Sequence, residues 1–192
     1  MDLSIKGIIY VKNKPLLNVD LEFTNGFYKI VGPNGSGKTT LLKTIAGFPE
    51  YKIDGHIIFN GEPIHGLPLY ERAKKGIFYL SQVLPNEVGY LKDILYALNI
   101  KDPELDRFRD KFLFKELSGG ESRIIDFLIT KNLNPKVLLL DEVETHLDKN
   151  NLQKIIDYLK NFKGIAIIVT HTNVFDILNP ITIDITKFKY NP

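Results

Sequence analysis

One stretch of this 192-residue chain combines the residue types and the spacing that can hold a phosphate group. Residues 32–39, GPNGSGKT, fit the pattern G-x-x-x-x-G-K-[ST]. The glycines let successive backbone N–H groups point at an anion, and the helix that should follow offers its positive N-terminal end. Lys38 is expected to reach the β- and γ-phosphates, and the Thr39 hydroxyl to bind Mg²⁺. The pattern therefore predicts a nucleotide-binding loop, whose expected contact residues are Gly32, Asn34, Gly35, Ser36, Gly37, Lys38, Thr39 and Thr40.

Two adjacent carboxylates could complete such a site. Residues 137–140, VLLL, have the character of an apolar strand, and Asp141 and Glu142 follow it directly. Asp141 is expected to help hold Mg²⁺, directly or through water, and Glu142 to orient or deprotonate the attacking water. The alternative is a pair of solvated carboxylates that only end a strand. The phosphate-binding pattern in the same chain favours the catalytic interpretation.

A third stretch, LSGGE at residues 117–121, places two adjacent glycines between a serine and a glutamate. Ser118 followed three residues later by Glu121 is typical of a helix N-terminal cap. Gly119 and Gly120 also allow close approach of the backbone to an anion at the start of that helix. The two functions are compatible, because a capped helix N-terminus can itself bind an anion.

The elements that must position these residues alternate between short apolar strands and helices. Strands are predicted at residues 3–10, 18–23, 27–31, 56–61, 76–81, 136–140 and 165–170, and helices at 38–46, 119–132 and 151–161. Residues 83–117 form a mixed helical stretch without strong periodicity. Apolar strands that alternate with helices favour an α/β fold with a parallel sheet covered on both faces.

The composition indicates a globular protein with one domain. A formal net charge of +2 gives no reason to expect direct nucleic-acid binding, and the absence of cysteine excludes disulfides and thiolate metal sites. The four histidines lack metal-ligand spacing. Because we find no signal-peptide core and no apolar run near the ~20 residues of a membrane span, we expect a cytoplasmic protein without direct membrane insertion.

Taken together, the three stretches resemble the Walker A, signature and Walker B motifs of an ABC-type ATPase, and they occur in that family's order. Gln82 follows an apolar strand as the family's Q-loop glutamine does, and His171 follows another as its switch histidine does. The resemblance implies a P-loop NTPase fold of ABC type, with an N-terminal antiparallel β subdomain, a parallel core sheet and a short helical subdomain. We expect the β subdomain and phosphate-loop core at about residues 1–82, the helical lobe at about 83–117, and the signature helix, Walker B and switch region at about 118–192.

The resemblance also implies ATP hydrolysis by a head-to-tail pair of subunits, either a homodimer or a heterodimer with a homologue. In such a pair the LSGG stretch of one subunit caps the γ-phosphate bound by the other, and Ser118 would donate a hydrogen bond to it. Tyr10 matches the aromatic residue that stacks on adenine, and Asp148 matches a residue at the dimer face. Asp148 could equally cap the next helix. Gln82 and His171 could likewise be a polar strand end and a capping histidine.

The family's residue roles transfer to positions that match its motifs, with ATP and Mg²⁺ as the expected cofactors. Catalysis is assigned to Lys38, Gln82, Glu142 and His171, and metal binding to Thr39, Gln82 and Asp141. Nucleotide contacts beyond the phosphate loop are assigned to Tyr10, Ser118, Gly119, Gly120, Glu121 and Asp148.

Two kinds of ABC ATPase compete for the finer assignment. Residues 47–55, GFPEYKIDG, and 67–78, LPLYERAKKGIF, resemble the soluble Suf-system ATPase of iron–sulfur cluster assembly. Val143 also stands where transporter ATPases usually have proline. Against this, the helical lobe is short, and Ile124 stands where the family often has arginine, with Arg123 one residue early. Because the two resembling stretches outweigh these departures, we expect a soluble assembly scaffold as the partner, with a membrane-spanning transporter subunit as the alternative.

Overall fold

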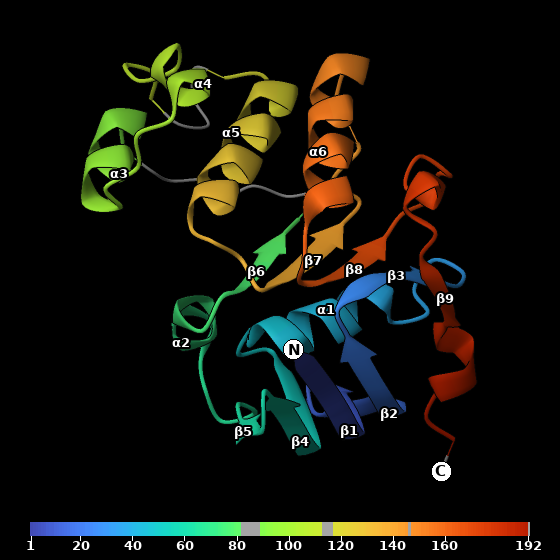
Figure 1. Cartoon of the computed structure of the whole chain (residues 1–192). Helices are drawn as coiled ribbons and strands as arrows, with labels where there is room; N and C mark the ends of the chain where they lie inside the picture. Colours follow the sequence, from blue (N-terminus) through green and yellow to red (C-terminus); the bar gives the residue numbers. More distant parts are fainter. Residues whose placement is uncertain (82–88, 113–116, 146, 192) are drawn as a thin grey trace.

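Two β-sheets form the frame of the molecule in the computed structural model, which describes residues 1–81, 89–112, 117–145 and 147–191 (Figure 1). The first sheet is antiparallel, in the order β2-β1-β4-β5, and consists of β1 (Asp2–Val11), β2 (Lys14–Thr24), β4 (Tyr51–Phe59) and β5 (Glu62–Pro63). The second sheet is parallel, in the order β6-β7-β8-β3-β9, and consists of β3 (Gly26–Val31), β6 (Ile77–Leu80), β7 (Val137–Asp141), β8 (Ile165–Val169) and β9 (Ile181–Asp184).

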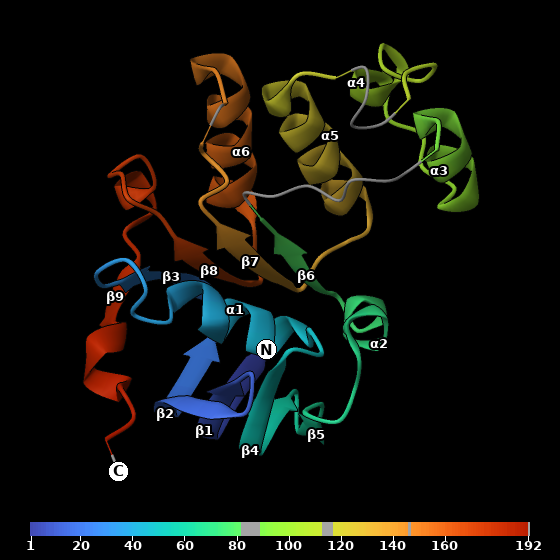
Figure 2. The ribbon, with the colours of Figure 1, turned by 180° about the vertical axis from the view of Figure 1, so that it is seen from behind.

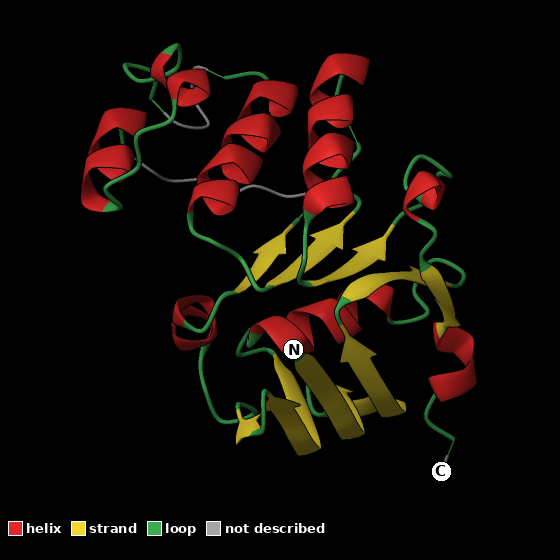
Figure 3. Ribbon diagram, in the orientation of Figure 1, coloured by secondary structure: helices red, strands yellow, loops and turns green. Residues whose placement is uncertain are grey.

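The helices cover both faces of the parallel sheet. Figure 3 shows α1 (Lys38–Ala46) between the two sheets, with α5 (Gly119–Asn132) and α6 (Lys149–Asn161) on the opposite face of the parallel sheet. Seen from behind in Figure 2, α3 (Leu91–Ala97) and α4 (Pro103–Asp106) stand beside α5 as a small lobe. The remaining short elements are α2 (Leu69–Lys74) and the 3₁₀ turns η1 (Asp176–Leu178) and η2 (Ile185–Phe188).

The central strands explain why one sheet can support two hydrophobic cores. Every residue of β7 and β8 is buried. Leu139 and Ile167 pack into the core that contains α1 and the antiparallel sheet. Leu138 and Ile168 face the other way, into the core formed with α5 and α6. Strands that are buried on both faces read as continuous apolar runs, which is the pattern that predicted them.

The predicted α/β fold and its antiparallel β subdomain are confirmed, and the limits of the helices at 38–46 and 119–132 match the structure. The strand expected at 56–61 in fact begins at Tyr51, because Gly55 continues the strand. Gly55 pairs with Gly7 of β1, and a Cβ on Gly7 would lie 2.2 Å from the Asp54 carbonyl oxygen. The two glycines, both at positive φ, therefore let the backbones of β1 and β4 approach each other closely at this point. The elements α2 and β9 were not predicted.

The end of α1 is held by a buried arginine. Arg72 of α2 is only 3% exposed. Its guanidinium donates to the carbonyl oxygens of Thr44 and Ile45 in the last turn of α1, at 2.8 and 2.7 Å. It also donates to the carbonyls of Leu67 at 2.8 Å and His65 at 3.0 Å. Burial lowers the pKa of Arg72 to about 10, so it remains charged at neutral pH. Arg72 thus satisfies carbonyls that a helix C-terminus leaves without partners.

Arg72→Met is expected to lower the free energy of unfolding by about 3 kcal/mol, because four carbonyl oxygens, two of them in buried hydrogen bonds, lose the guanidinium as a donor. Equilibrium unfolding in urea would measure the change. Lys74→Met is the matched control, since Lys74 lies on the same helix with an exposed side chain and an exposed partner, Glu71. A loss for Arg72→Met no larger than that of this control would contradict the capping role.

Candidate functional site

The phosphate loop connects β3 to α1 and rests closely on two apolar side chains. Its glycines Gly32, Gly35 and Gly37 have φ values of +150°, +75° and +102°. A Cβ on Gly32 would lie 2.8 Å from the Ile185 side chain, and one on Gly37 would lie 3.0 Å from Leu17. Around Gly35, by contrast, no described atom would lie within 4 Å of such a Cβ. The loop therefore needs glycine both for its backbone conformation and for its close packing, and it is open at Gly35.

Two polar groups of the loop are arranged to meet an anion. The buried Lys38 ammonium donates to the carbonyl oxygens of Gly32 at 2.8 Å and Pro33 at 3.0 Å, which holds it over the loop. The Ser36 hydroxyl is buried and has no hydrogen-bond partner among the described residues. Buried hydroxyls are normally satisfied, so an orphaned one in a loop of this shape fits a phosphate oxygen as its acceptor.

Asp141, at the end of β7, meets the first turn of α1. The Thr39 hydroxyl donates to one carboxylate oxygen at 3.1 Å, and the Tyr79 hydroxyl donates to the other at 2.8 Å. Burial raises the pKa of Asp141, and the hydrogen bonds from Tyr79 and Thr39 partly oppose that shift. The described residues contain no group of three or more histidine, cysteine or acidic side chains that could hold a metal. Thr39 and Asp141 are oxygen ligands that suit Mg²⁺, which commonly takes its other ligands from phosphate and water.

The next residue, Glu142, meets the expected switch histidine. Its carboxylate lies 2.8 Å from the His171 Nε2 atom. Glu142 has a φ of +52°, an uncommon conformation for a residue other than glycine, and its N–H donates to the Val169 carbonyl at 2.9 Å. Both side chains are partly exposed at the carboxyl edge of the parallel sheet, next to Asp141. This carboxylate–imidazole pair has the composition of a water-activating site.

Glu144, an acidic residue two positions after Glu142, was not predicted from the sequence as part of the site. The Thr170 hydroxyl donates to one carboxylate oxygen of Glu144, and the other oxygen is buried without a partner among the described residues. Thr170 also accepts a hydrogen bond from the Thr172 N–H at 3.0 Å. The turn after β7 is thereby tied to the segment on both sides of His171. Tyr79 was missed as well, although a hydroxyl in an otherwise apolar strand was an available signal.

The LSGGE stretch forms the predicted helix cap. The Glu121 N–H donates to the Ser118 hydroxyl oxygen at 3.2 Å, and the Ser118 N–H donates to the Glu121 carboxylate at 2.8 Å. The hydrogen bond from the Ser118 backbone lowers the pKa of Glu121. Gly119 and Gly120 begin α5. In Figures 1 and 2, α5 stands with the lobe helices, apart from α1, and among the described residues no hydrogen bond or ion pair joins this stretch to residues 32–39.

Among the described residues, two other predicted site residues, Asp148 and Tyr10, form no hydrogen bond or ion pair with the phosphate loop. Asp148 caps α6 by accepting from the Asn151 N–H at 2.8 Å, which is the alternative role considered for it. Tyr10 lies on β1, paired with Pro15 and Lys52, and no described contact links it to the phosphate loop. Gln82, predicted as a catalytic and metal-binding residue, lies outside the described residues.

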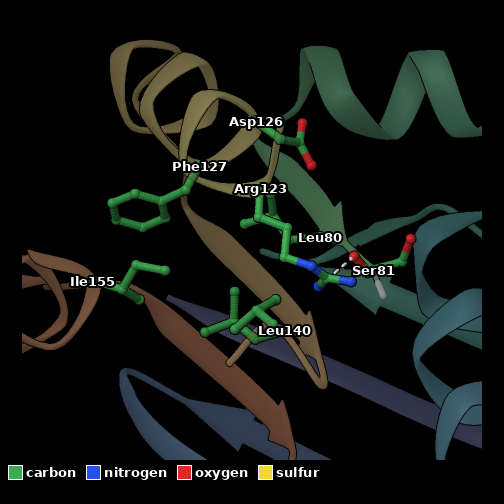
Figure 4. Close-up of a pocket in the computed structure, with 8 residues that line it drawn as sticks. Leu80, Ser81, Arg123, Asp126, Phe127, Leu140 and Ile155 are labelled. Carbon is green, nitrogen blue, oxygen red and sulfur yellow. Dashed lines mark hydrogen bonds between the residues drawn. The ribbon is translucent and has the colours of Figure 1, made fainter. Parts of the chain in front are cut away.

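Arg123 of α5, which lies one residue before the position where the family often has arginine, reaches the end of β6. Figure 4 shows Arg123 directed at the Ser81 carbonyl, to which its guanidinium donates at 3.3 Å. Ile124, which stands where the family often has arginine, is fully buried in the core. A cavity of about 10 Å³ lies beside Arg123, where burial raises the pKa of Asp126 to about 6. Arg123 therefore links α5 to the residue immediately before Gln82. The cavity is lined by Leu80, Ser81, Arg123, Asp126, Phe127, Leu140, Val143 and Ile155.

Comparison with known proteins gives consistent matches over most of the chain. A family model described as ABC transporter matches residues 16–145. A probable ATP-dependent transporter of Synechocystis sp. is 32% identical, over 83% of this chain and 74% of its own length. The molybdate/tungstate import ATP-binding protein WtpC of Methanocaldococcus jannaschii is 37% identical, over 83% of this chain and 59% of its own length.

A solved structure is similar over nearly the whole chain. It is a putative ATP-binding protein of an ABC transporter from Pyrococcus furiosus, with 26% identity and a TM-score of 0.72 over 99% of this chain and all of that one. The descriptions of these three proteins name transport, and none names iron–sulfur assembly. Among the helices of the described residues, none combines the length and the apolar character that a membrane span requires.

Proposed function

Since the chain belongs to the ABC transporter family, whose domains bind and hydrolyse ATP, we propose that it is the nucleotide-binding subunit of a transporter. ATP hydrolysis in this subunit would drive a conformational change in a membrane-spanning partner. The transporter relatives favour this assignment over the expected iron–sulfur assembly scaffold.

The observation that carries the proposal is the meeting of two segments at one edge of the parallel sheet. The first turn of α1 touches Asp141 through Thr39, and the following residue, Glu142, touches His171. In this arrangement Lys38 and the loop N–H groups bind the phosphates, and Thr39 and Asp141 would hold Mg²⁺. When bound, Mg²⁺ supplies neutralisation of charge on the phosphate oxygens. Glu142 orients the attacking water and accepts its proton, while His171 fixes the carboxylate in position.

The placement of α5 supports a head-to-tail pair of subunits. Ser118 has no described contact with the phosphate loop of its own chain, and α5 stands with the lobe helices rather than with α1. A role for Ser118 at a γ-phosphate therefore requires the phosphate loop of a second subunit. The capped N-terminus of α5 then adds its dipole to the binding of that phosphate.

Ser118→Ala is expected to lower kcat for ATP about tenfold while leaving ATP affinity of the dilute, monomeric chain unchanged. Because the hydroxyl also caps α5, the substitution costs about 1 kcal/mol of stability. Ser118→Asp separates the two roles, since aspartate caps a helix well but repels a phosphate. Steady-state kinetics and nucleotide titration measure both variants. Wild-type turnover in Ser118→Asp would mean that Ser118 serves only as a cap.

A soluble iron–sulfur assembly ATPase is the second candidate, favoured by the residue pattern at 47–55 and 67–78. The contacts of Arg72 weaken this candidate, because they give the arginine in the second run a structural role at the end of α1. That role is useful in any member of the fold.

Affinity purification of the tagged protein from its native cells, with membrane and soluble fractions handled separately, distinguishes the two candidates. Recovery with an integral membrane protein is the result expected for a transporter subunit. Recovery only with soluble, cysteine-bearing partners would overturn that assignment in favour of iron–sulfur assembly. Release of phosphate from ATP by the purified chain tests the enzymatic activity itself, and its absence in the presence of the purified partner would count against both candidates.

A further inference from the structure

A lysine on the strand before the phosphate loop reaches the segment that follows the switch histidine. Lys29 lies on β3, and its side chain is 12% exposed. Its ammonium donates to an Asp176 carboxylate oxygen at 2.7 Å and to the Thr172 carbonyl at 3.2 Å. A third acceptor, the Asn173 side-chain oxygen, lies at 3.5 Å. All three acceptors of this one ammonium come from residues 172–176.

The lysine of this ion pair differs from that of an ordinary surface ion pair, because its side chain is 12% exposed, while that of its partner Asp176 is 48% exposed. Lys6 and Asp20, in the antiparallel sheet, also form a close pair, but their side chains are 61% and 64% exposed. Exposed pairs of that kind contribute little, because water competes for both charges. The Lys29 ammonium has three N–H groups and three acceptors within reach, so it holds the segment in a defined place.

The segment is held from its other side as well. The Thr172 N–H donates to the Thr170 hydroxyl at 3.0 Å, and Thr170 is itself bound to Glu144. The N–H of Thr172 is thus fixed by Thr170 and its carbonyl by Lys29. His171 lies between Thr170 and Thr172, which are both held by these hydrogen bonds. Phe175, further along the chain, is fully buried in the core. The backbone that carries the imidazole therefore has little freedom relative to β3.

We propose that Lys29 is a positioning residue for ATP hydrolysis, which ties residues 171–176 to the strand that leads into the phosphate loop. The tie keeps the His171 imidazole at the Glu142 carboxylate, and it makes the position of His171 follow that of the phosphate loop. This inference rests on the proposed function, since it requires that His171 contributes to turnover. Lys29 itself touches neither His171 nor Glu142 in the described contacts and acts through the backbone of Thr172.

The test is a double-mutant cycle between Lys29 and His171. Lys29→Met is expected to lower kcat about tenfold with less than a twofold change in KM for ATP, because it displaces a catalytic group without removing a phosphate contact. Lys29→Arg, which keeps the charge and the donors, is expected to recover part of the loss. Lys6→Met is the matched control and should leave kcat and KM unchanged. In a His171→Ala background, Lys29→Met is expected to have no further effect, since the group that it positions is gone.

The possible outcomes distinguish the positioning role of Lys29 from the catalytic role of His171. Multiplicative losses in the double variant would overturn the positioning role, because they would mean that Lys29 acts independently of His171. Wild-type turnover in His171→Ala would instead contradict the proposed function of the site. Should Lys29→Met fail to fold, Asp176→Asn weakens the same tie from the other end with an isosteric side chain. No change in kcat for a folded Asp176→Asn variant would then overturn the proposal.

Discussion

Replacing Glu142 with glutamine is expected to reduce ATP turnover at least about 100-fold while leaving ATP binding intact. A general base contributes roughly 10²–10⁴-fold to a reaction of this kind, and an amide cannot accept the proton. The amide oxygen has nearly the same position as the carboxylate oxygen, so the contact with His171 at 2.8 Å can be kept. The substitution therefore removes the chemistry and preserves the geometry.

Three measurements separate these effects. Phosphate release reports turnover, titration with a fluorescent ATP analogue reports binding, and size-exclusion chromatography with ATP reports assembly. In the proposed head-to-tail pair hydrolysis releases the two subunits, so the variant is expected to accumulate as an ATP-bound dimer. Glu62→Gln is the control, since Glu62 pairs with Lys75 on the surface and lies outside the site. Glu142→Gln that hydrolyses ATP like the wild type would show that another group activates the water.

Lys38→Ala is expected to weaken ATP binding itself, by about 100-fold or more. The ammonium supplies a full positive charge at a buried position, and charge-assisted hydrogen bonds to phosphate are among the strongest that a side chain makes. The change also removes the donor that the carbonyls of Gly32 and Pro33 share. The loop is therefore expected to lose part of its shape together with its charge.

Isothermal titration with ATP measures the affinity, and thermal unfolding without nucleotide shows whether the chain still folds. ATP should raise the melting temperature of the wild type but not of the variant, because only a bound ligand stabilises the native state. Lys14→Ala, an exposed lysine on β2, controls for the loss of one positive charge. Equal ATP affinity in the wild type and Lys38→Ala would remove the basis for assigning residues 32–39 to phosphate binding.

Where local chemistry determines an element, the sequence predicted it well. The helix at 38–46 lies between two glycines in the left-handed conformation, and the helix at 119–132 begins with a serine–glutamate capping box. Both are signals within a few residues of the element, and both sets of limits were predicted correctly. The buried central strands were found for a similar reason, since burial on both faces leaves an unbroken apolar run.

Contacts between distant segments could not be predicted in the same way. Arg72 caps a helix that ends well before it in the chain, and its role depends on how α2 packs against α1. Tyr79 meets Asp141 only because β6 lies beside β7 in the sheet. Lys29 meets Asp176 for the corresponding reason, through the pairing of β3 with β8. In each case the partner is set by the packing of distant elements, by helix against helix for Arg72 and by the order of the strands for Tyr79 and Lys29, which the local pattern does not contain.

The packing of the phosphate loop has a consequence for the synthesis of the protein. The loop rests on Leu17, which precedes it, and on Ile185, which lies near the end of the described chain. A nascent chain whose residue 185 is still inside the ribosome carries the complete GPNGSGKT sequence without the Ile185 side chain beside it. We therefore expect the phosphate loop to reach its final packing only late in translation.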